Sequence, residues 1–416
     1  MYSDFNIDSK LEKLSLEVEE EIKDIFNKID NNVLNWSSRV LKAFQDENVS
    51  ISDFNEVKGY GENDGGREKL ERVYSKVFRA EDALVRPQIM SGTHALTVTF
   101  FGLLRYGDTL ISISGKPYDT IRTVIGTEGK SESSLIKSGI KYEEIDLIDN
   151  DFDYESIKNR LSKNDVKMVE IQRSVGYSSR RSINISKIEK VIKEIRKVNK
   201  DVIIFVDNCY GCFVEEKDPI EVGADIIASS LMKNLGSGIA SSGGYIVGKK
   251  KYIKLISERL NVPGMYKNIG ANFGVLETYY KGLFNAPEVV GNALKTQVFA
   301  SCLLEKLGFN TYPKYNEKRA DIVQVVEFGD EKKLIDFCKG MQKSGAIDSF
   351  VTPVAENMAG YPHKEIMAGS SFIPGATIEL SCDGPLIPPY KAFMQGGITY
   401  EYGKLGILIA INNMKK

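Results

Sequence analysis

A small-residue turn is the first feature of the sequence that could carry chemistry. The tripeptide Ser91-Gly92-Thr93 stands shortly before the apolar run 95–104. If that run is a helix, its first N–H groups are free and its positive dipole end faces the tripeptide. Together they make a site for an anion, most often phosphate. The plain alternative is an ordinary helix N-cap.

An acid and an amine follow further along the chain. Asp207 ends the apolar segment 201–207, and a carboxylate at the carboxyl end of a buried parallel strand faces the crevice where α/β folds bind ligands. Lys233 follows the segment 224–230 and precedes a glycine-rich turn, where a desolvated amine can form a Schiff base. The plain alternatives are a turn-capping aspartate and a solvated surface lysine.

The three groups together provide what pyridoxal 5′-phosphate (PLP) requires. These requirements are a phosphate cradle, an acid for the pyridine nitrogen and an amine for the aldehyde. A buried aspartate keeps the pyridine nitrogen protonated through its opposite charge. The order of the three groups within one α/β region therefore predicts a PLP site.

The composition is that of an ordinary globular protein. The 416 residues hold 55 Lys and Arg against 57 Asp and Glu, a balance that gives no footprint for nucleic acid or an anionic membrane. No apolar stretch approaches the roughly 20 residues that a bilayer requires, and the acidic N-terminus does not read as a signal peptide. We therefore expect a soluble, cytoplasmic protein without a nucleic-acid or membrane partner.

The metal-ligating residue types are scarce. The chain has two histidines and one CxxC, formed by Cys209 and Cys212, whereas a structural zinc site needs about four ligands. We therefore expect no metal. A redox role for the two cysteines and simple packing beside a strand end remain the alternatives for this pair.

The elements that must position the three groups alternate between strands and helices. The segment 201–207 has no polar alternation, which is typical of a parallel strand covered by helices on both faces. Ser186 and Glu189 predict a capping box at the start of a helix over 186–200. The other strand candidates are 109–114, 141–147, 166–172, 224–230 and 243–249.

The flanking regions have different patterns. The first fifty residues and the stretch 268–307 are predicted to be helical, the latter with a break near Pro287. Residues 357–400 hold few regular signals and are predicted to form loops at a functional site or interface. The tail further holds strand candidates at 321–329 and 377–382, a helix candidate at 331–344 and the apolar run 406–411.

These motifs resemble those of the fold-type I PLP enzymes, specifically the subfamily of cystathionine and methionine lyases. The most specific block comprises Asp207-Asn208, Gly223-Ala224-Asp225 and Ser230-Leu231-Met232-Lys233, with an interval slightly different from the usual one. The whole chain is similar to the branch named for aluminium resistance, also labelled methionine γ-lyase-like. The matching words include GYGENDGGREKLE, IQRSVGYSSR, VDNCYGCFVEE and MQGGITYEYG.

The resemblance implies an α/β fold in which a large domain with a mostly parallel seven-stranded sheet is followed by a smaller C-terminal α+β domain. The expected boundaries are 1–55 for an N-terminal helical segment, 56–285 for the PLP-binding domain and 286–416 for the small domain. It also implies a homodimer or homotetramer with its active site at the subunit interface.

The resemblance assigns a role to each site residue. Lys233 would form the Schiff base and move protons, and Asp207 would pair with the pyridine nitrogen. Tyr118 would stack on the ring, which Ser174 would also reach. Tyr60 would lend its hydroxyl to the phosphate of the neighbouring subunit. The residues expected around the phosphate of their own subunit are Ser91, Gly92, Thr93 and Ser230.

Some positions depart from the family pattern. The arginine that grips the substrate carboxylate is replaced by Glu379, which would repel a carboxylate. Arg173 is the residue that we expect to take over this role, with Arg181 and Arg319 as alternatives. The arginine usually found two residues after the tyrosine of the neighbouring subunit is absent as well, since position 62 is Glu62. His94 is expected either to stack on the cofactor or to cap its helix.

The resulting hypothesis is a PLP-dependent carbon–sulfur lyase that acts on a small sulfur amino acid by β- or γ-elimination. Another PLP reaction on the same fold, such as transamination, racemisation or aldol cleavage, is the first alternative. A non-catalytic relative is the second. A nucleotide-binding α/β protein is a third, although the sequence has no Walker or Rossmann glycine motif.

Overall fold

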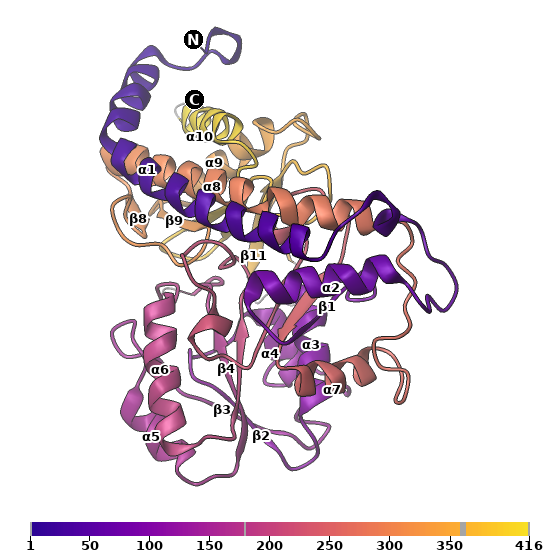
Figure 1. The fold of residues 1–416 in the computed structure, drawn as a ribbon. Coiled ribbons are helices and arrows are strands. Elements are labelled where there is room, and N and C mark those ends of the chain that lie inside the picture. Colours follow the sequence, from indigo (N-terminus) through magenta and orange to yellow (C-terminus); the bar gives the residue numbers. More distant parts are fainter. Residues whose placement is uncertain (1, 179, 358–362, 415–416) are drawn as a thin grey trace.

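The computed structural model describes residues 2–178, 180–357 and 363–414, which build two sheets and the helices around them (Figure 1). The first sheet has seven strands in the order β1-β7-β6-β5-β4-β2-β3. Its strands are β1 (Asp82–Arg86), β2 (Thr109–Ser112), β3 (Lys141–Glu144), β4 (Val166–Gln172), β5 (Ile203–Asp207), β6 (Ile226–Ser230) and β7 (Gly244–Gly248).

The pairing in this sheet is mostly parallel, as predicted. Strands β3, β2, β4, β5 and β6 run parallel to one another, and only β7 pairs antiparallel, with β6 on one side and β1 on the other. All five residues of β5 are buried, which explains their lack of polar alternation. Strand β1 was not predicted, because five residues with charged ends carry little local signal until β7 pairs with them.

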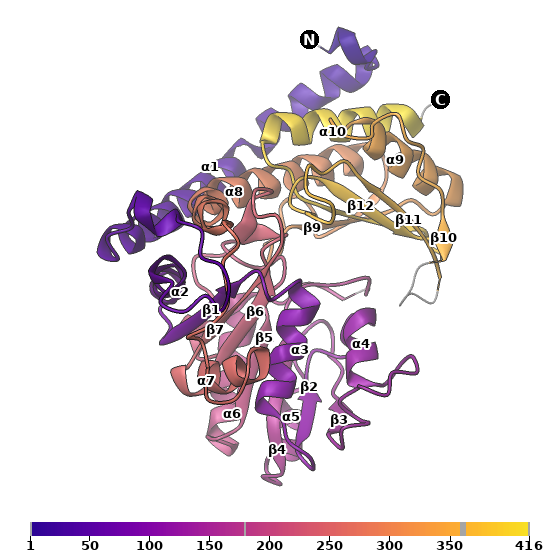
Figure 2. The same cartoon turned by 90° about the vertical axis from the view of Figure 1, so that its right-hand side faces the viewer.

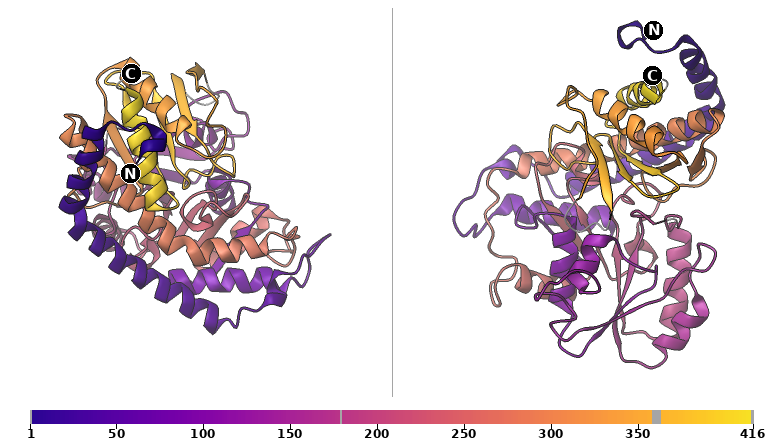
Figure 3. Two further views of the ribbon diagram at one scale, coloured as in Figure 1. Left: turned by 90° about the horizontal axis from the view of Figure 1, so that it is seen from above. Right: turned by 180° about the vertical axis from the view of Figure 1, so that it is seen from behind.

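Helices cover both faces of the seven-stranded sheet. Helices α3, α4 and α7 pack on one face, and α2, α5 and α6 pack on the other, so the sheet lies between two helical layers (Figure 3). Their bounds are α2 (Gly65–Phe78), α3 (Gly92–Leu103), α4 (Asp119–Ile125), α5 (Tyr154–Leu161), α6 (Ile185–Val198) and α7 (Lys250–Leu260).

The start of α6 differs from the prediction. Asn184 is the N-cap, since its side chain accepts a hydrogen bond from the Lys187 N–H at 3.0 Å. Ser186 already lies inside the helix and donates its hydroxyl to the Asn184 side chain at 2.8 Å. The predicted capping box of Ser186 and Glu189 is therefore wrong, because the asparagine two residues earlier reaches the free N–H first.

Two long helices lie side by side and contribute side chains to the hydrophobic cores of both sheets (Figure 1). Helix α1 (Ser9–Asp46) and helix α8 (Leu276–Lys306) contribute to the core of the large sheet and to that of the second sheet. The predicted break at Pro287 is wrong, since this residue is buried inside α8. Packing against α1 offsets the hydrogen bond that the proline lacks. None of the helices in the described parts combines the length and apolar character needed to cross a membrane.

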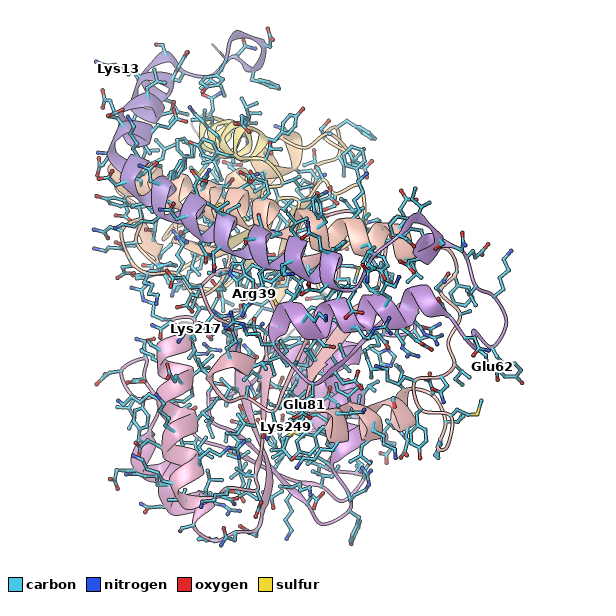
Figure 4. The ribbon with its side chains drawn as sticks, viewed as in Figure 1. Lys13, Arg39, Glu62, Glu81, Lys217 and Lys249 are labelled. Atoms are coloured by element: carbon cyan, nitrogen blue, oxygen red, sulfur yellow. The ribbon has the colours of Figure 1, made fainter. Side chains whose placement is uncertain are left out.

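Side-chain ion pairs tie α1 to the large domain. Arg39 on α1 forms two hydrogen bonds with the Glu221 carboxylate, at 2.8 and 2.6 Å, at the boundary between the two halves of the molecule (Figure 4). Trp36, one turn earlier, donates its indole N–H to the Glu215 carbonyl at 2.8 Å. The long N-terminal helix therefore fixes the relative position of the elements that it crosses.

The second sheet has six antiparallel strands in the order β10-β11-β12-β13-β9-β8, and α9 and α10 cover one face of it (Figure 2). Its elements are β8 (Asn310–Tyr312), β9 (Val323–Glu327), α9 (Glu331–Lys343), β10 (Glu356–Asn357), β11 (Lys364–Gly369), β12 (Ser381–Pro385), β13 (Lys391–Gln395) and α10 (Tyr400–Met414). Short 3₁₀ turns are η1 (Ser3–Phe5), η2 (Ile51–Phe54), η3 (Pro219–Val222) and η4 (Asn234–Gly236).

The C-terminal region is more regular than the sequence suggested. Strands β11, β12 and β13 fall within the stretch 357–400, of which residues 358–362 lie outside the described residues. The strand predicted at 377–382 is displaced, because a turn from Ala376 to Glu379 delays its start until Ser381. The apolar run 406–411 lies inside α10.

Candidate active site

A cavity of about 370 Å³ lies between the carboxyl ends of β4 to β6, the N-terminus of α3 and the second sheet. Most of the residues predicted for the site line this cavity. They are Ser91, Gly92, Thr93, Tyr118, Ser174, Asp207, Ser230 and Lys233, whereas Tyr60 and Arg173 do not line it. A larger open groove of about 640 Å³ between α1, α6 and α8 contains none of these residues.

The start of α3 forms an anion-binding turn at one end of the cavity. The Ser91 hydroxyl accepts a hydrogen bond from the His94 N–H at 3.1 Å and caps the helix. A Cβ atom on Gly92 would lie 3.2 Å from Ser230 Cβ, so the glycine allows the first turn of α3 to approach the end of β6 closely. The remaining N–H groups of this turn stay available for an anion.

His94 takes neither of the two roles considered for it, since Ser91 caps α3 and the His94 ring lies outside the cavity. Its ring nitrogen Nδ1 accepts a hydrogen bond from the Met90 N–H at 3.2 Å, and the residue does not line the cavity. Burial lowers the pKa of His94. The neutral ring therefore helps to fix the turn before α3.

Asp207 is a buried carboxylate that forms no ion pair with a cationic side chain of the described residues. Its Oδ1 accepts a hydrogen bond from the Cys209 N–H at 3.0 Å. Burial raises the pKa of Asp207, although the hydrogen bonds from Cys209 and the positive charges of Lys233 and Arg180 oppose this effect. A protonated pyridine nitrogen would supply the missing cation, so this side chain fits the cofactor.

Lys233 lies beside Asp207 at the same end of the sheet. Its Nζ is 3.8 Å from the centre of the Tyr210 ring, and the side chain is enclosed by the cavity wall. Burial by itself lowers the pKa of Lys233, but the acidic groups of Tyr210, Cys209, Tyr118 and Asp207 outweigh it and raise the pKa. In the free protein this amine is therefore held as a cation.

Tyr118 is fixed at both of its ends. Its N–H donates to the side chain of Gln172 at 2.8 Å, and its hydroxyl lies 2.8 Å from the Thr93 hydroxyl. Burial raises the pKa of Tyr118, so the phenol stays neutral. Gln172 was not predicted, although it ends β4 next to Asp207 on β5, and the strand-end argument used for Asp207 could have found it.

Arg173 does not reach the cavity, and its predicted role as substrate anchor is wrong. The side chain is fully buried, and its Nη2 pairs with Glu215 at 2.8 Å. Its Nη1 donates to Asn208 at 2.9 Å and to the Gly211 carbonyl at 2.7 Å. These partners engage the guanidinium in the protein interior.

The other candidate anchors also lie outside the cavity. Arg181 pairs with Glu317 at 3.2 Å, and Arg319 donates to Gln324 at 2.6 Å. Glu379 accepts hydrogen bonds from the N–H groups of Phe372 and Ile373 and braces that loop. No guanidinium belonging to the described residues lines the cavity.

Tyr60 lies on an exposed loop away from the cavity of its own chain. Its side chain is 79% exposed, and Glu62, two residues later, marks the outer edge of the molecule in Figure 4. Arg67 holds the loop by donating to the Gly61 carbonyl at 2.6 Å and to the Asn268 carbonyl at 3.3 Å. The single chain therefore leaves the role of Tyr60 in a neighbouring subunit a prediction.

The two cysteines of the CxxC are buried and free. Cys209 lines the cavity and accepts a hydrogen bond from the Ser229 hydroxyl at 3.4 Å, whereas Cys212 contacts the Tyr245 hydroxyl. Within residues 2–178, 180–357 and 363–414, no cluster of three or more His, Cys, Asp or Glu side chains is arranged to hold a metal ion.

The second sheet contributes residues that the sequence analysis missed. Asp383 on β12 and Gln395 on β13 line the cavity, and the Gln395 amide donates to Asp383 at 3.1 Å. The Tyr210 hydroxyl lies 3.5 Å from the Gln395 oxygen and connects this pair to the ring beneath Lys233. No local signal marks these positions, because the register between strands decides which of their side chains face the cavity.

Comparisons with known proteins agree with this arrangement. The family model described as methionine gamma-lyase matches residues 11–415. The protein YnbB of Bacillus subtilis (strain 168) is 44% identical over 406 residues, which is 97% of this chain and 96% of YnbB.

Solved structures give the same result. A carbon–sulfur lyase involved in aluminium resistance from Clostridium novyi NT is 43% identical, with a TM-score of 0.95 over 99% of this chain and 97% of that one. The PLP-dependent protein YhfS of Escherichia coli shares the fold, with a TM-score of 0.62 at 17% identity over 91% of this chain and 95% of YhfS. The chain therefore has the fold of the fold-type I PLP-dependent enzymes, and it belongs to the methionine gamma-lyase family.

Proposed function

We propose that the protein is a PLP-dependent carbon–sulfur lyase that acts on a sulfur amino acid by β- or γ-elimination. The observation that carries the proposal is that Asp207, Lys233 and the N-terminus of α3 face one cavity. Membership of the methionine gamma-lyase family and the similarity to a carbon–sulfur lyase of Clostridium novyi support the reaction class.

The residues of the cavity fit PLP in three ways. The first turn of α3 and the Ser230 hydroxyl would hold the phosphate, and the buried Asp207 lacks the cation that a pyridine nitrogen provides. Lys233 would hold the aldehyde. When bound, the cofactor supplies an electron sink for the carbanion that forms at the α-carbon of an amino acid.

The chain itself would move the protons of the reaction. Lys233 would serve as the base that takes the α-proton of the substrate. The raised pKa of Lys233 depends on neighbouring acids, so binding a cation at Asp207 weakens one of the interactions that keep the amine protonated. Tyr118 stays neutral and is fixed by Gln172, which suits a ring-stacking role.

The active form is proposed to be a homodimer or homotetramer. The loop with Tyr60 is joined to the loop that follows α7, since the Gly270 N–H donates to the Tyr60 carbonyl at 2.7 Å. Gln88, three residues before Ser91, donates to the Ala271 carbonyl at 2.6 Å. The main chain of Tyr60 is thus held in place while its side chain is exposed, which suits the tyrosine to reach a second subunit.

The first test is the visible spectrum of the purified protein after incubation with PLP. We expect a yellow absorption band that borohydride reduction fixes onto Lys233, as peptide mass analysis can verify. The protein should then release a keto acid and ammonia from cystathionine, methionine or cysteine. A protein that stays colourless in the presence of PLP would refute the cofactor, and a yellow protein that releases no keto acid would refute the lyase reaction.

The oligomer is tested by mixing two inactive variants. Tyr60→Ala removes the residue lent to the neighbour, and Lys233→Ala removes the amine of the subunit's own site. If Tyr60 acts across the interface, mixed oligomers hold one complete site and regain part of the activity. A light-scattering mass equal to one chain would contradict the proposal.

One observation favours another PLP reaction on an amino acid as the second candidate. The family arginine is replaced by Glu379, and none of the described residues puts a guanidinium into the cavity. The binding mode of the α-carboxylate thus differs from that of the lyases. A panel of amino acids assayed for transamination, racemisation and aldol cleavage distinguishes this candidate from elimination.

A further inference from the structure

One carboxylate of the cavity is not among the residues expected to bind the cofactor. Asp383 lines the cavity from β12, and the amide of Gln395 donates to its Oδ2 at 3.1 Å. Tyr177 also hydrogen-bonds to this carboxylate. No lysine, arginine or histidine of the described residues forms an ion pair with Asp383, and the two side chains that hydrogen-bond to it, Gln395 and Tyr177, are neutral.

The other charges of the cavity already have partners or roles. Asp119 pairs with Arg122 at 3.2 Å, and Asp207 is the residue that would pair with the pyridine nitrogen. Lys233 is the only cationic side chain among the described lining residues. The wall around Asp383 is neutral, and its lining residues are Val323, Met367, Thr377, Phe393 and Gln395.

The setting of Asp383 favours a ligand cation. Burial raises the pKa of this carboxyl, while the hydrogen bonds from Gln395 and Tyr177 and the charge of Lys233 act in the opposite direction. A partly buried carboxylate is stabilised when a cation is placed against it and destabilised by a second anion. The wall formed by the second sheet therefore discriminates by charge.

We propose that Asp383 determines substrate specificity by binding an ammonium group at the far end of the sulfur substituent, and that it disfavours a carboxylate there. The inference rests on the proposed lyase function and names its substrate class: amino acids whose thioether substituent carries a cationic group.

The test compares three substrates that differ only in the charge of the far end. They are the S-(2-aminoethyl), S-(2-hydroxyethyl) and S-(2-carboxyethyl) derivatives of L-cysteine, with the same derivatives of L-homocysteine to cover γ-elimination. The holoenzyme should release keto acid with the highest kcat/KM from the aminoethyl compound. We expect a preference of about tenfold to a hundredfold over the hydroxyethyl compound, the range for one hydrogen bond to a charged group.

Two variants separate a specific contact from a general charge effect. Asp383→Asn keeps the shape of the side chain and should remove the preference for the aminoethyl compound. Asp119→Asn removes another carboxylate of the cavity, one that shares Arg122 with Glu128, and it should preserve the order of the three substrates. A preference that survives in Asp383→Asn would overturn the inference.

The outcomes distinguish the inference from the function on which it rests. Keto acid released from all three compounds at equal kcat/KM would overturn the inference and leave the lyase function intact. No keto acid from any derivative would overturn the inference alone if cystathionine, methionine or cysteine still yields keto acid, and it would overturn the lyase function as well if none of those three does.

A binding measurement provides a readout that needs no turnover. L-lysine, L-norleucine and L-2-aminoadipate have similar lengths and no thiol leaving group, and they differ in the charge of the far end. L-lysine should raise the melting temperature of the holoenzyme more than the other two compounds. In Asp383→Asn the three melting temperatures should coincide, and an unchanged advantage of L-lysine would contradict the assignment.

Discussion

The two walls of the cavity hold their polar groups in different ways. On the wall formed by the large sheet, the key side chains are fixed by main-chain groups nearby in the sequence, as when the Cys209 N–H binds Asp207 and the His94 N–H binds Ser91. On the wall formed by the second sheet, Asp383 is held by Gln395, a side chain from the adjacent strand. The first wall carries the groups for the reaction, and the second carries the group that we propose selects the substrate.

This difference separates two kinds of substitution. A change on the first wall should alter the rate for every substrate by a similar factor, because the cofactor chemistry is common to all of them. A change on the second wall should alter the ratio between substrates. The following variants test that separation, from the largest expected effect to the smallest.

Lys233→Ala should give the largest loss. Without the amine, kcat/KM should fall by about 10²–10⁴-fold for each of the three cysteine derivatives, as is typical when a proton-transfer group is removed. Keto-acid release measures the effect. Lys233→Arg keeps a positive charge and should be equally inactive. An arginine variant with wild-type activity would show that only the charge at this position matters.

Arg173→Met should change stability instead of specificity. It removes the buried partner of Glu215, which keeps its ion pair with Lys318 at 2.9 Å, so we expect the free energy of unfolding to fall by about 1–3 kcal/mol. Urea unfolding measures the loss, and Arg181→Met, which breaks a half-exposed pair, is the control. A raised KM with unchanged stability would restore the substrate-binding role that the structure removes.

Asp207→Asn should slow all substrates together. The neutral amide cannot hold a protonated pyridine nitrogen, so we expect a loss of about tenfold to a hundredfold in kcat/KM. The ratio between the aminoethyl and hydroxyethyl derivatives should stay at its wild-type value. If this ratio changes as much as in Asp383→Asn, the two walls do not act separately.

Glu170→Gln should change how the stability of the protein depends on pH, because it removes a buried carboxyl group near Asp207. Burial raises the pKa of Glu170 to about 8, and the charge of Asp207 contributes to this rise. Folding therefore takes up a proton, and the stability that this proton contributes is lost as the pH rises from the unfolded-state pKa through about 8. The glutamine variant should be the more stable form at pH 9, by about 1 kcal/mol or more. Thermal unfolding of the wild type and of the variant at pH 5 and pH 9 measures how their difference in stability changes with pH. A difference that is the same at both pH values would contradict the prediction.

Glu379→Gln should have the smallest effect. The amide oxygen can still accept hydrogen bonds from Phe372 and Ile373, so the free energy of unfolding should change by no more than about 1 kcal/mol. Limited proteolysis of the loop 370–376 and the KM for each substrate provide the readouts. A large rise in KM would place Glu379 in the substrate site, against its position outside the cavity.

The candidate site was predictable wherever its residues lie at strand ends or helix starts. Asp207 and Lys233 follow apolar segments, and Ser91 precedes a long apolar run, so each is marked by its immediate neighbours. The mostly parallel sheet was predictable for the same reason, since the uninterrupted apolar run of β5 indicates a strand that is buried on both faces.

The predictions from the sequence were wrong where contacts with distant segments determine the local structure. Pro287 sits inside α8 because α1 packs along that helix, and β1 exists because β7 pairs with it. Arg173 was assigned to the substrate from its place in a motif, but Glu215, forty-two residues away, captures its guanidinium. Tertiary contacts override a local pattern whenever a buried charge or an unpaired edge requires a partner.

The sequence by itself determined the α/β class and the order in which an anion turn, an acid and an amine arrive at one sheet edge. Those features depend on short-range periodicity and on the geometry of parallel strands. Only the tertiary structure decided that Asp383 and Gln395 complete the cavity and that no arginine of the described residues enters it. Strand register sends alternate side chains to opposite faces, and a shift of one residue would have turned Asp383 away from the site.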